Sequence, residues 1–467
     1  HALAGAGGLG AVVAAQASNT SNATTVAKLA GKVSADYVSI NAQHGTDFQG
    51  KANSMMASAL GFSGAQVNNT SKTTTLAELA DNSQVAAEAF RLKAHSTVTK
   101  GTANADFTVR SASGGVLNGA SGSSATTLDN DTSAVVGEDA LITVAKANGQ
   151  GTLNIAASND IKAYDAVLLD TGGAIAVAVG ASTIDVNRAN AAVVLGAGAL
   201  LQSDGKVSLE SSTAADVVTQ TQVKTYGLAG VPVGRSRSNI NTANSVALNG
   251  ARVASDDNVS VVAGANNTLS ASAETYLWNK TAKPINTKPE AHGQITQNNT
   301  ISIAATHLST SGSADASEQQ IARAAIAAVK DISLNAGAGR HVAHGYGSGT
   351  DLYREVVEDV AKFFGQDVSL DIKGGSTSDN SRSSDLVDGT LFAGTQHAQY
   401  LTVSADGKTV TQSNSMGYTT ADGVSLADVY TAQINYLHDR YEAYKDTDAD
   451  VAGGFLNDEN ILRALQA

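Results

Sequence analysis

The sequence repeats itself at a fixed distance, and this repeat limits the folds open to the chain. The eleven residues Thr20–Ala30 return as Thr70–Ala80, with seven identities at a spacing of 50. Self-similarity at a period of this size is typical of solenoids, propellers and arrays, in which one small unit is stacked on copies of itself. A compact domain with one central core is therefore not expected.

A second pair of segments supports the same period. The run that starts at Asn187 returns at Asn241, 54 residues later, and the strand at Val207 returns at Val259, 52 residues later. Weaker copies begin near Asn130 and Asn298, giving a unit of about 50 to 60 residues that occurs about six times.

Each unit has the same internal order. A glycine-rich apolar run such as Gly172–Gly180 comes first, followed by a polar Asn/Thr step and short strands in which apolar residues alternate with polar ones. One such strand pair cannot bury its own apolar face, whereas stacked copies can. Asn at the corners tolerates left-handed backbone and pairs its amide with the next copy. A disordered Gly/Ser/Thr-rich linker is the alternative, but it would not keep apolar alternation.

Composition agrees with a narrow core. Only 4% of residues are aromatic and Trp occurs once, so small side chains must fill the interior at native density. Cysteine is absent, which excludes disulfides and thiolate metal sites. The net charge of -13 argues against nucleic acid as a partner. No apolar run approaches the roughly 20 residues of a membrane-spanning helix, so the chain is not expected to be transmembrane.

The repeat resembles that of a known family. The order Gly-Gly, apolar run, Asn-x-x-Asn, apolar-Gly-Ala and Asp-x-x-Val-x-Val in Gly172–Leu209 and Asn241–Ala263 is similar to filamentous haemagglutinin-like adhesins, and closest to the leukotoxin-type filamentous adhesins. Ala2–Ala42 carries a fainter copy, and His344–Asp351 resembles later segments of such proteins. The resemblance implies a right-handed parallel β-helix, secretion across the outer membrane, and a non-enzymatic role in adhesion or in extracellular filaments at the bacterial cell surface.

The chain is expected to divide into three regions. Residues 1–340 are predicted to form the β-solenoid, and residues 341–415 to continue it, with a helix near 351–364 that Thr350 or Asp351 caps and that packs on the side of the solenoid. Strands are expected to resume at Val368–Ile372. Residues 416–467 are predicted to form a helical cap, because apolar and tyrosine residues there follow a 3.6-residue period. The fold class is thus all-β with a few helical insertions.

Assembly is expected as well. Ala2–Ala15 is like the middle of a repeat, lacks the basic start of a signal peptide, and follows His1 instead of Met, so we expect a piece of a larger precursor or a chain whose first repeat a neighbour covers. Self-association into filaments, head to tail or laterally, is the predicted partnership. A host or neighbouring cell surface, or a glycan, is the expected target of an adhesin.

Two clusters are candidates for contacts. Tyr276–His292 holds two of the three prolines and is predicted to be a protruding loop, since proline is expelled from central strands. Its surface contact candidates are Trp278, Lys280, Lys283 and Lys288. The alternating carboxylates Asp446, Asp448 and Asp450, with Glu459, are candidate calcium ligands, although the run lacks the turn glycine and the final glutamate of an EF-hand. A solvated acidic loop is the alternative.

An enzyme on the same fold is the rival function. Some β-helices bind or degrade polysaccharides with several acidic residues on one coil, and the acidic residues of one strand region are the candidates, namely Asp371, Asp379, Asp385 and Asp388. Their Ser/Gly-rich surroundings favour turns instead. His341 and His344 lack a third zinc ligand, so they are expected to be ordinary loop residues.

Overall fold

The computed structural model describes residues 1–393, apart from 102–106, 147–149, 305, 308–320, 323 and 364, together with scattered positions beyond 393. Within residues 1–393 so described, the fold is all-β with a single helix, α1 (Leu352–Phe363), and a 20-stranded sheet whose pairings are almost all parallel. The longest strands are β1 (Ala2–Leu29), β2 (Lys32–Phe48), β3 (Ala52–Leu79), β4 (Gln84–Lys100), β6 (Leu117–Val136), β8 (Thr152–Leu195), β10 (Val207–Asn249), β13 (Thr268–Pro284) and β14 (Glu290–Ala304).

Successive coils of the chain stack in parallel register. Equivalent positions pair in the order Ala2, Ala52, Val109, Val167, Thr221, Thr275 and Gly347, at spacings of 50, 57, 58, 54, 54 and 72 residues. The predicted unit of 50–60 residues is confirmed for five of these steps. The sixth is longer because 20 residues separate Ala304 from Ala325, where only two separate Asn249 from Arg252.

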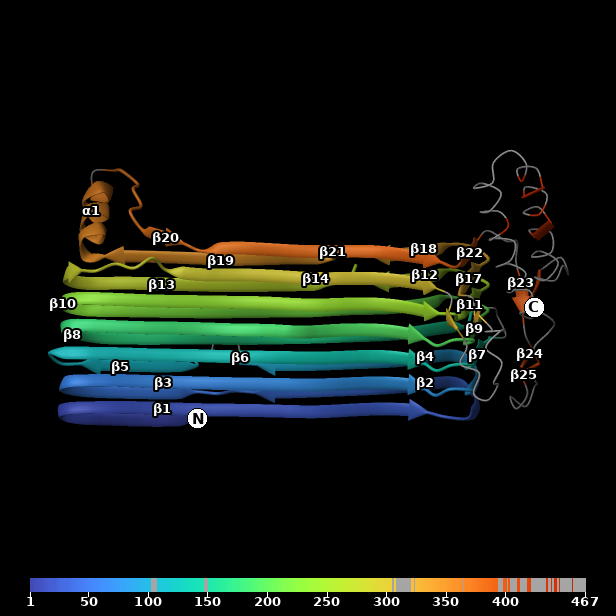
Figure 1. The fold of residues 1–467 in the computed structure, drawn as a ribbon, viewed down its shortest axis with the longest axis horizontal. Coiled ribbons are helices and arrows are strands. Elements are labelled where there is room, and N and C mark those ends of the chain that lie inside the picture. Colours follow the sequence, from blue (N-terminus) through green and yellow to red (C-terminus); the bar gives the residue numbers. More distant parts are fainter. Residues whose placement is uncertain are drawn as a thin grey trace.

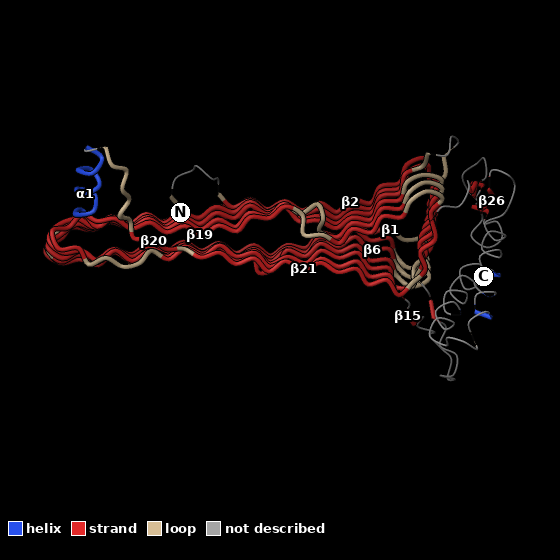
Figure 2. The backbone as a smooth tube through the Cα atoms, turned by 90° about the horizontal axis from the view of Figure 1, so that it is seen from above, coloured by secondary structure: helices blue, strands red, loops and turns tan. Residues whose placement is uncertain are grey.

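Each coil is a long flattened loop. Figure 1 shows the coils side by side in sequence order, and Figure 2 shows that the two long sides meet in a tight turn at one end and open into a wider end at the other. Short stacked strands close the wider end, namely β7 (Leu141–Val144), β9 (Leu200–Ser203), β11 (Arg252–Ser255), β17 (Ala325–Ala328) and β22 (Thr390–Ala393). The remaining strands of the stack are β5 (Val109–Gly114), β12 (Val259–Ala263), β18 (Ile332–Ala336), β19 (Arg340–Asp351), β20 (Ile372–Gly374) and β21 (Ser376–Asp388).

The interior consists of three apolar clusters separated by two polar layers. One cluster lies at the wide end around Leu195 and Leu248, one in the middle around Ile161 and Ile184, and one near the turn around Leu169. The first polar layer lies between the turn-side and middle clusters, and its buried members include Lys100, Ser124, Thr126, Asp165, Ser182, Thr219 and Ser238. The second lies between the middle and wide-end clusters, and its buried members include Asn130, Asn159, Thr213, Asn244, Asn267, Gln297 and Asn299.

The second polar layer confirms that Asn amides pair from coil to coil, but these residues lie inside strands such as β10 and β14 and not at corners as predicted. Asn244 Nδ2 donates to Asn299 Oδ1 at 2.9 Å, and Thr73 Oγ1 donates to Asn130 Oδ1 at 2.8 Å. The predicted equivalence of Asn190 with Asn244 is off by one residue. Asn187 is an extra, exposed residue in β8, and this bulge shifts the register so that Asn244 pairs with Ala191.

The last coil carries α1 at its turn end (Figure 2). The predicted helix is confirmed, and its cap is Asp351, whose Oδ1 accepts from the backbone N–H groups of Tyr353 and Arg354 at 3.0 Å. The helix contacts the stack through Glu355, which pairs with Lys280 at 3.2 Å, and through the Tyr353 hydroxyl, which donates to the carbonyl oxygen of Ala282. It buries none of its residues, and Phe363 is 86% exposed. The strand expected at Val368–Ile372 begins only at Ile372 and runs antiparallel to β19.

The predicted helical cap at 416–467 lies almost wholly outside the described residues. Six further short strands lie between Ala304 and Ala325 and beyond residue 393, and they form three antiparallel pairs. They are β15 (Thr306–His307), β16 (Ile321–Ala322), β23 (Ala398–Tyr400), β24 (Thr402–Val403), β25 (Val410–Thr411) and β26 (Tyr418–Thr420).

Candidate functional surfaces

Several of the tight turns are built from glycine. Gly115 and Gly227 have φ of +151° and +122°, and a Cβ on Gly227 would lie 1.8 Å from the carbonyl oxygen of Gly173 in the coil beneath. Only glycine fits this combination of backbone angle and close approach. The pairs Gly114-Gly115 and Gly172-Gly173 therefore mark turns, and the apolar runs after them lie where the chain doubles back.

An exposed apolar strip follows these turns from coil to coil. We call it the turn surface and define it by Leu9, Val12, Leu60, Phe62, Val116, Leu117, Ile175, Val177, Val179 and Leu228. The stretches that carry it contain no Asp, Glu, Lys or Arg from Ala52 to Ser71, from Ser111 to Leu128 and from Thr171 to Ile184. Contiguous exposed apolar area of this kind marks interaction surfaces in proteins.

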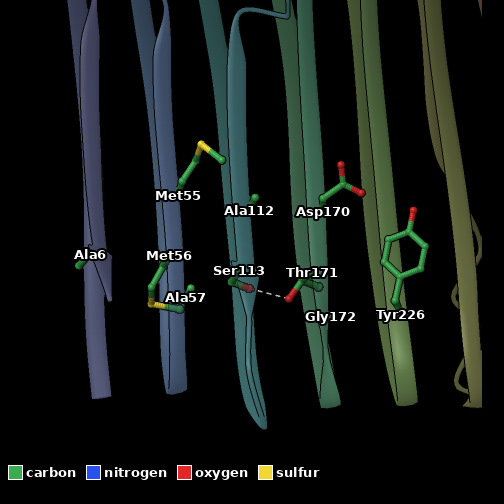
Figure 3. Close-up of a pocket in the computed structure, with 10 residues that line it drawn as sticks. All are labelled: Ala6, Met55, Met56, Ala57, Ala112, Ser113, Asp170, Thr171, Gly172 and Tyr226. Atoms are coloured by element: carbon green, nitrogen blue, oxygen red, sulfur yellow. Dashed lines mark hydrogen bonds between the residues drawn. The ribbon is translucent and has the colours of Figure 1, made fainter. Parts of the chain in front are cut away.

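A shallow groove crosses the stack beside the turn surface (Figure 3). Its lining comes from β1, β3, β5, β8 and β10, with Met55, Met56, Asp170 and Tyr226 as its largest side chains. Ser113 and Thr171 bond across neighbouring coils at 2.6 Å, so their hydroxyls are already paired. The groove offers one carboxylate, from Asp170, and one phenol, from Tyr226.

An aromatic cluster lies on the outer face of β13 and β19, and we call it the aromatic face. The rings of Tyr276 and Trp278 stack with centroids 5.8 Å apart and 17° between planes, and Tyr346 of the next coil lies 5.9 Å from Tyr276. Lys224 Nζ lies 5.2 Å from the Trp278 ring. Burial, together with the Glu274 carboxylate, raises the pKa of Tyr276 to about 12, so its hydroxyl stays protonated and donates to Glu274 Oε2 at 3.1 Å.

The predicted loop at Tyr276–His292 is much shorter than expected. Trp278 and Lys280 lie within β13, which runs to Pro284, and only residues 285–289 connect it to β14. β13 has β10 on one side and β19 on the other, so the strand continues until Pro284.

The four surface contact candidates lie in β13 and in the connection that follows it. Trp278 belongs to the aromatic face, and Lys280 pairs with Glu355 of α1 at 3.2 Å. Lys283 and Lys288 are exposed near the turn, where Lys288 lines a second groove with Arg235 and Arg237.

The acidic residues proposed for a polysaccharide-degrading site are apart. Asp379 and Asp385 lie six residues from one another along β21, about 20 Å at the rise of a strand. Paired carboxylates that hydrolyse glycosides lie within about 10 Å. Asp371 accepts from Ser348 at 2.7 Å, and Asp388 ends β21. Asp379 and Asp385 are therefore too far apart along β21 for such a pair.

The two histidines point to opposite faces of β19. His341 faces the interior, where its Nε2 lies 2.8 Å from Asp379 Oδ2, whereas His344 is exposed and its ring lies 6.3 Å from that of Tyr346. Among the residues that the structure describes, no group of three His, Cys, Asp or Glu side chains is placed to hold a metal ion. The calcium candidates Asp446, Asp448, Asp450 and Glu459 lie outside the described residues.

Sequence reasoning missed the buried pair of Lys100 and Asp165. Lys100 ends β4 and Asp165 lies in β8, and both side chains are at most 1% exposed. The sequence did contain a sign of this pair. Side chains two residues apart in a strand point to the same face, so Lys100 points to the core as Val98 does. A lysine at an inward position requires a partner.

Comparison with known proteins gives no relative: no family model, curated protein or solved structure matches the chain. In the part of the chain that the structure describes, no helix is long and apolar enough to cross a membrane.

Proposed function

We propose that the chain is a non-enzymatic segment of a secreted bacterial surface adhesin, or a subunit of an extracellular filament, and that its coils form a right-handed β-helix. The handedness is supported by a general rule: parallel strands joined by a crossover connect in the right-handed sense in about 98% of cases. The resemblance of the repeats to filamentous haemagglutinin-like adhesins supports the extracellular role.

The turn surface is the observation that carries this proposal. Leu9, Phe62 and Leu228 are 87%, 64% and 64% exposed on three different coils, so apolar side chains line one edge of the stack. An edge that is long, narrow and free of charge suits lateral contact between rods, because it buries apolar area along its whole length without desolvating ions.

Negative-stain electron microscopy of the purified chain at a series of dilutions tests the assembly. We expect laterally associated rods or fibres at high concentration, which separate on dilution. Replacing Leu60 and Phe62 with glutamate should abolish association, since two carboxylates would be desolvated in the contact.

The matched control replaces Gln66 and Thr70 with glutamate. Both are exposed positions of the same strand, β3, beyond the turn surface, so this variant adds the same charge and should still associate. Rods of the unmodified chain that never associate, or equal loss of association in both variants, would contradict the proposal.

Calcium is a proposed ligand of the acidic run Asp446–Asp450 with Glu459. The same microscopy with a calcium chelator tests it: loss of fibres on chelation and their return with calcium would support a structural ion. Fibres that persist unchanged in the chelator would contradict a structural role for calcium.

Polysaccharide binding is the second candidate function, and the aromatic face favours it. Stacked rings with carboxylate and ammonium groups beside them suit the apolar faces and hydroxyls of sugar rings. Trp278 is the only tryptophan, so its fluorescence reports the site directly. Titration with neutral and acidic glycans should shift this emission, and Tyr276→Ala should weaken the response. Emission that no glycan changes would count against this candidate.

A further inference from the structure

The first polar layer holds a lysine and an aspartate in direct contact, shut off from solvent. Lys100 Nζ contacts Asp165 Oδ1 and also donates to the carbonyl oxygen of Tyr164 at 2.8 Å. Ser124 Oγ donates to Asp165 Oδ1 and Thr126 Oγ1 to Asp165 Oδ2, each at 2.7 Å. The apolar neighbours belong to the middle cluster on one side and the turn-side cluster on the other.

We propose that Lys100 and Asp165 become joined by an isopeptide bond, an amide between Lys100 Nζ and Asp165 Cγ that forms within the folded chain. The geometry brings the amine and the carboxyl group into contact, and neither has another ionic partner among the described residues. The proposal is independent of the adhesin or filament role.

The reaction balances without an oxidant or a co-reactant. The nitrogen lone pair of the neutral amine attacks Cγ of the protonated carboxyl group, which forms the C–N bond. One C–O bond then breaks, and that oxygen leaves as water with the acid proton and one amine proton. Formally, an ammonium and a carboxylate become one neutral amide and one molecule of water.

The surrounding groups suit this step. Negative charge develops on the carboxyl oxygens as the C–N bond forms, and the Ser124 and Thr126 hydroxyls already donate to them. Burial lowers the pKa of Lys100 to about 7, so a substantial fraction of the amine is neutral and nucleophilic at neutral pH. Holding the two groups in contact replaces a bimolecular encounter with an intramolecular one.

The product fits the site better than the ion pair. A secondary amide has one N–H, which would donate to the Tyr164 carbonyl, and one C=O, which would keep the hydroxyl that donates to the retained oxygen. An ammonium has three N–H donors for the two acceptors that it contacts. Amide formation also removes two buried charges, whose desolvation is costly.

The bond would tie one coil to the next. Lys100 lies at the end of the coil that begins at Ala52, and Asp165 lies at the end of the coil that begins at Val109. The two residues are 65 positions apart, so the crosslink would close a loop that denaturants and pulling forces could not extend.

Mass spectrometry of the full chain, denatured, tests the proposal. The expected mass is lower than that of the sequence by one water molecule. Tryptic digestion should give one branched species, Ala94–Arg110 joined to Ala163–Arg188, with no cleavage after Lys100. Separate Ala94–Lys100 and Ala163–Arg188 peptides, in a protein of full mass, would overturn the proposal and leave an ordinary buried ion pair.

The control is the double variant Lys100→Met with Asp165→Leu, which fills the same space without leaving an unpaired charge. It should fold and show the full mass of its own sequence. A loss of water that persists in this variant would come from elsewhere, such as a succinimide at Asp204-Gly205, and would also overturn the proposal. Ser124→Ala with Thr126→Val should slow crosslinking in freshly folded protein and leave uncrosslinked chains to be detected.

Discussion

Asn299→Ala is expected to lower the free energy of unfolding by about 3 kcal/mol, because several buried polar groups lose a partner together. Asn299 accepts from Asn244 Nδ2 at 2.9 Å, and its own Nδ2 donates to Gln297 Oε1 at 3.1 Å and to the carbonyl oxygen of Gly337 at 2.8 Å. The alanine also leaves a gap between the middle and wide-end apolar clusters. Urea denaturation followed by circular dichroism measures the change.

The neighbouring Asn298 gives a matched control. It is exposed on the outer face of the same strand, β14, so Asn298→Ala should change stability by no more than about 0.5 kcal/mol. Equal effects of the two substitutions would show that the second polar layer does not hold the coils together.

Gly227→Val is expected to destabilise the protein by about 3 kcal/mol or more, since a branched side chain would be strained at this backbone angle. The positive φ of +122° disfavours any L side chain, and the new Cβ would meet the Gly173 carbonyl oxygen at 1.8 Å. The turn must open to relieve both, which separates this coil from the one beneath. Thermal unfolding of the purified variant measures the loss.

Gly45→Val is the comparison for that experiment. Gly45 lies in β2, and a Cβ there would meet no atom within 4 Å. Valine also suits a strand better than glycine does, so this variant should be as stable as the unmodified chain or slightly more so. A Gly227 variant of unchanged stability would mean that the coils do not turn as described.

The register of the coils could be read from the sequence where the repeat is regular. Thr20 pairs with Thr70 and Val207 with Val259, as the spacings of 50 and 52 predict. The bulge at Asn187 could not be predicted, because one extra residue in a strand leaves the motif intact and shifts only its pairing. The spacing of 72 residues between Thr275 and Gly347 could not be predicted either, because an insertion between Ala304 and Ala325 interrupts the repeat.

The candidate surfaces were predictable only in part. The two prolines near residue 285 marked the end of a strand correctly, but the extent of the loop was wrong because β10 and β19 hold β13 as far as Pro284. Trp278 was identifiable as the single tryptophan. Its neighbour Tyr346 was not, because it comes from the next coil, 70 residues after Tyr276, at an offset that the repeat does not specify.

The central claim is that consecutive coils stack in parallel register, and spin-label distances test it most directly. Asn154, Ser208, Ser260 and Ser333 pair in turn on the outer face of four coils, and the chain has no cysteine of its own to interfere with labelling. Labels taken in pairs should give separations that rise by about 5 Å per coil, reaching about 15 Å between positions 154 and 333. Separations that do not rise in this order, or a far larger distance between positions 154 and 333, would contradict the stacked fold.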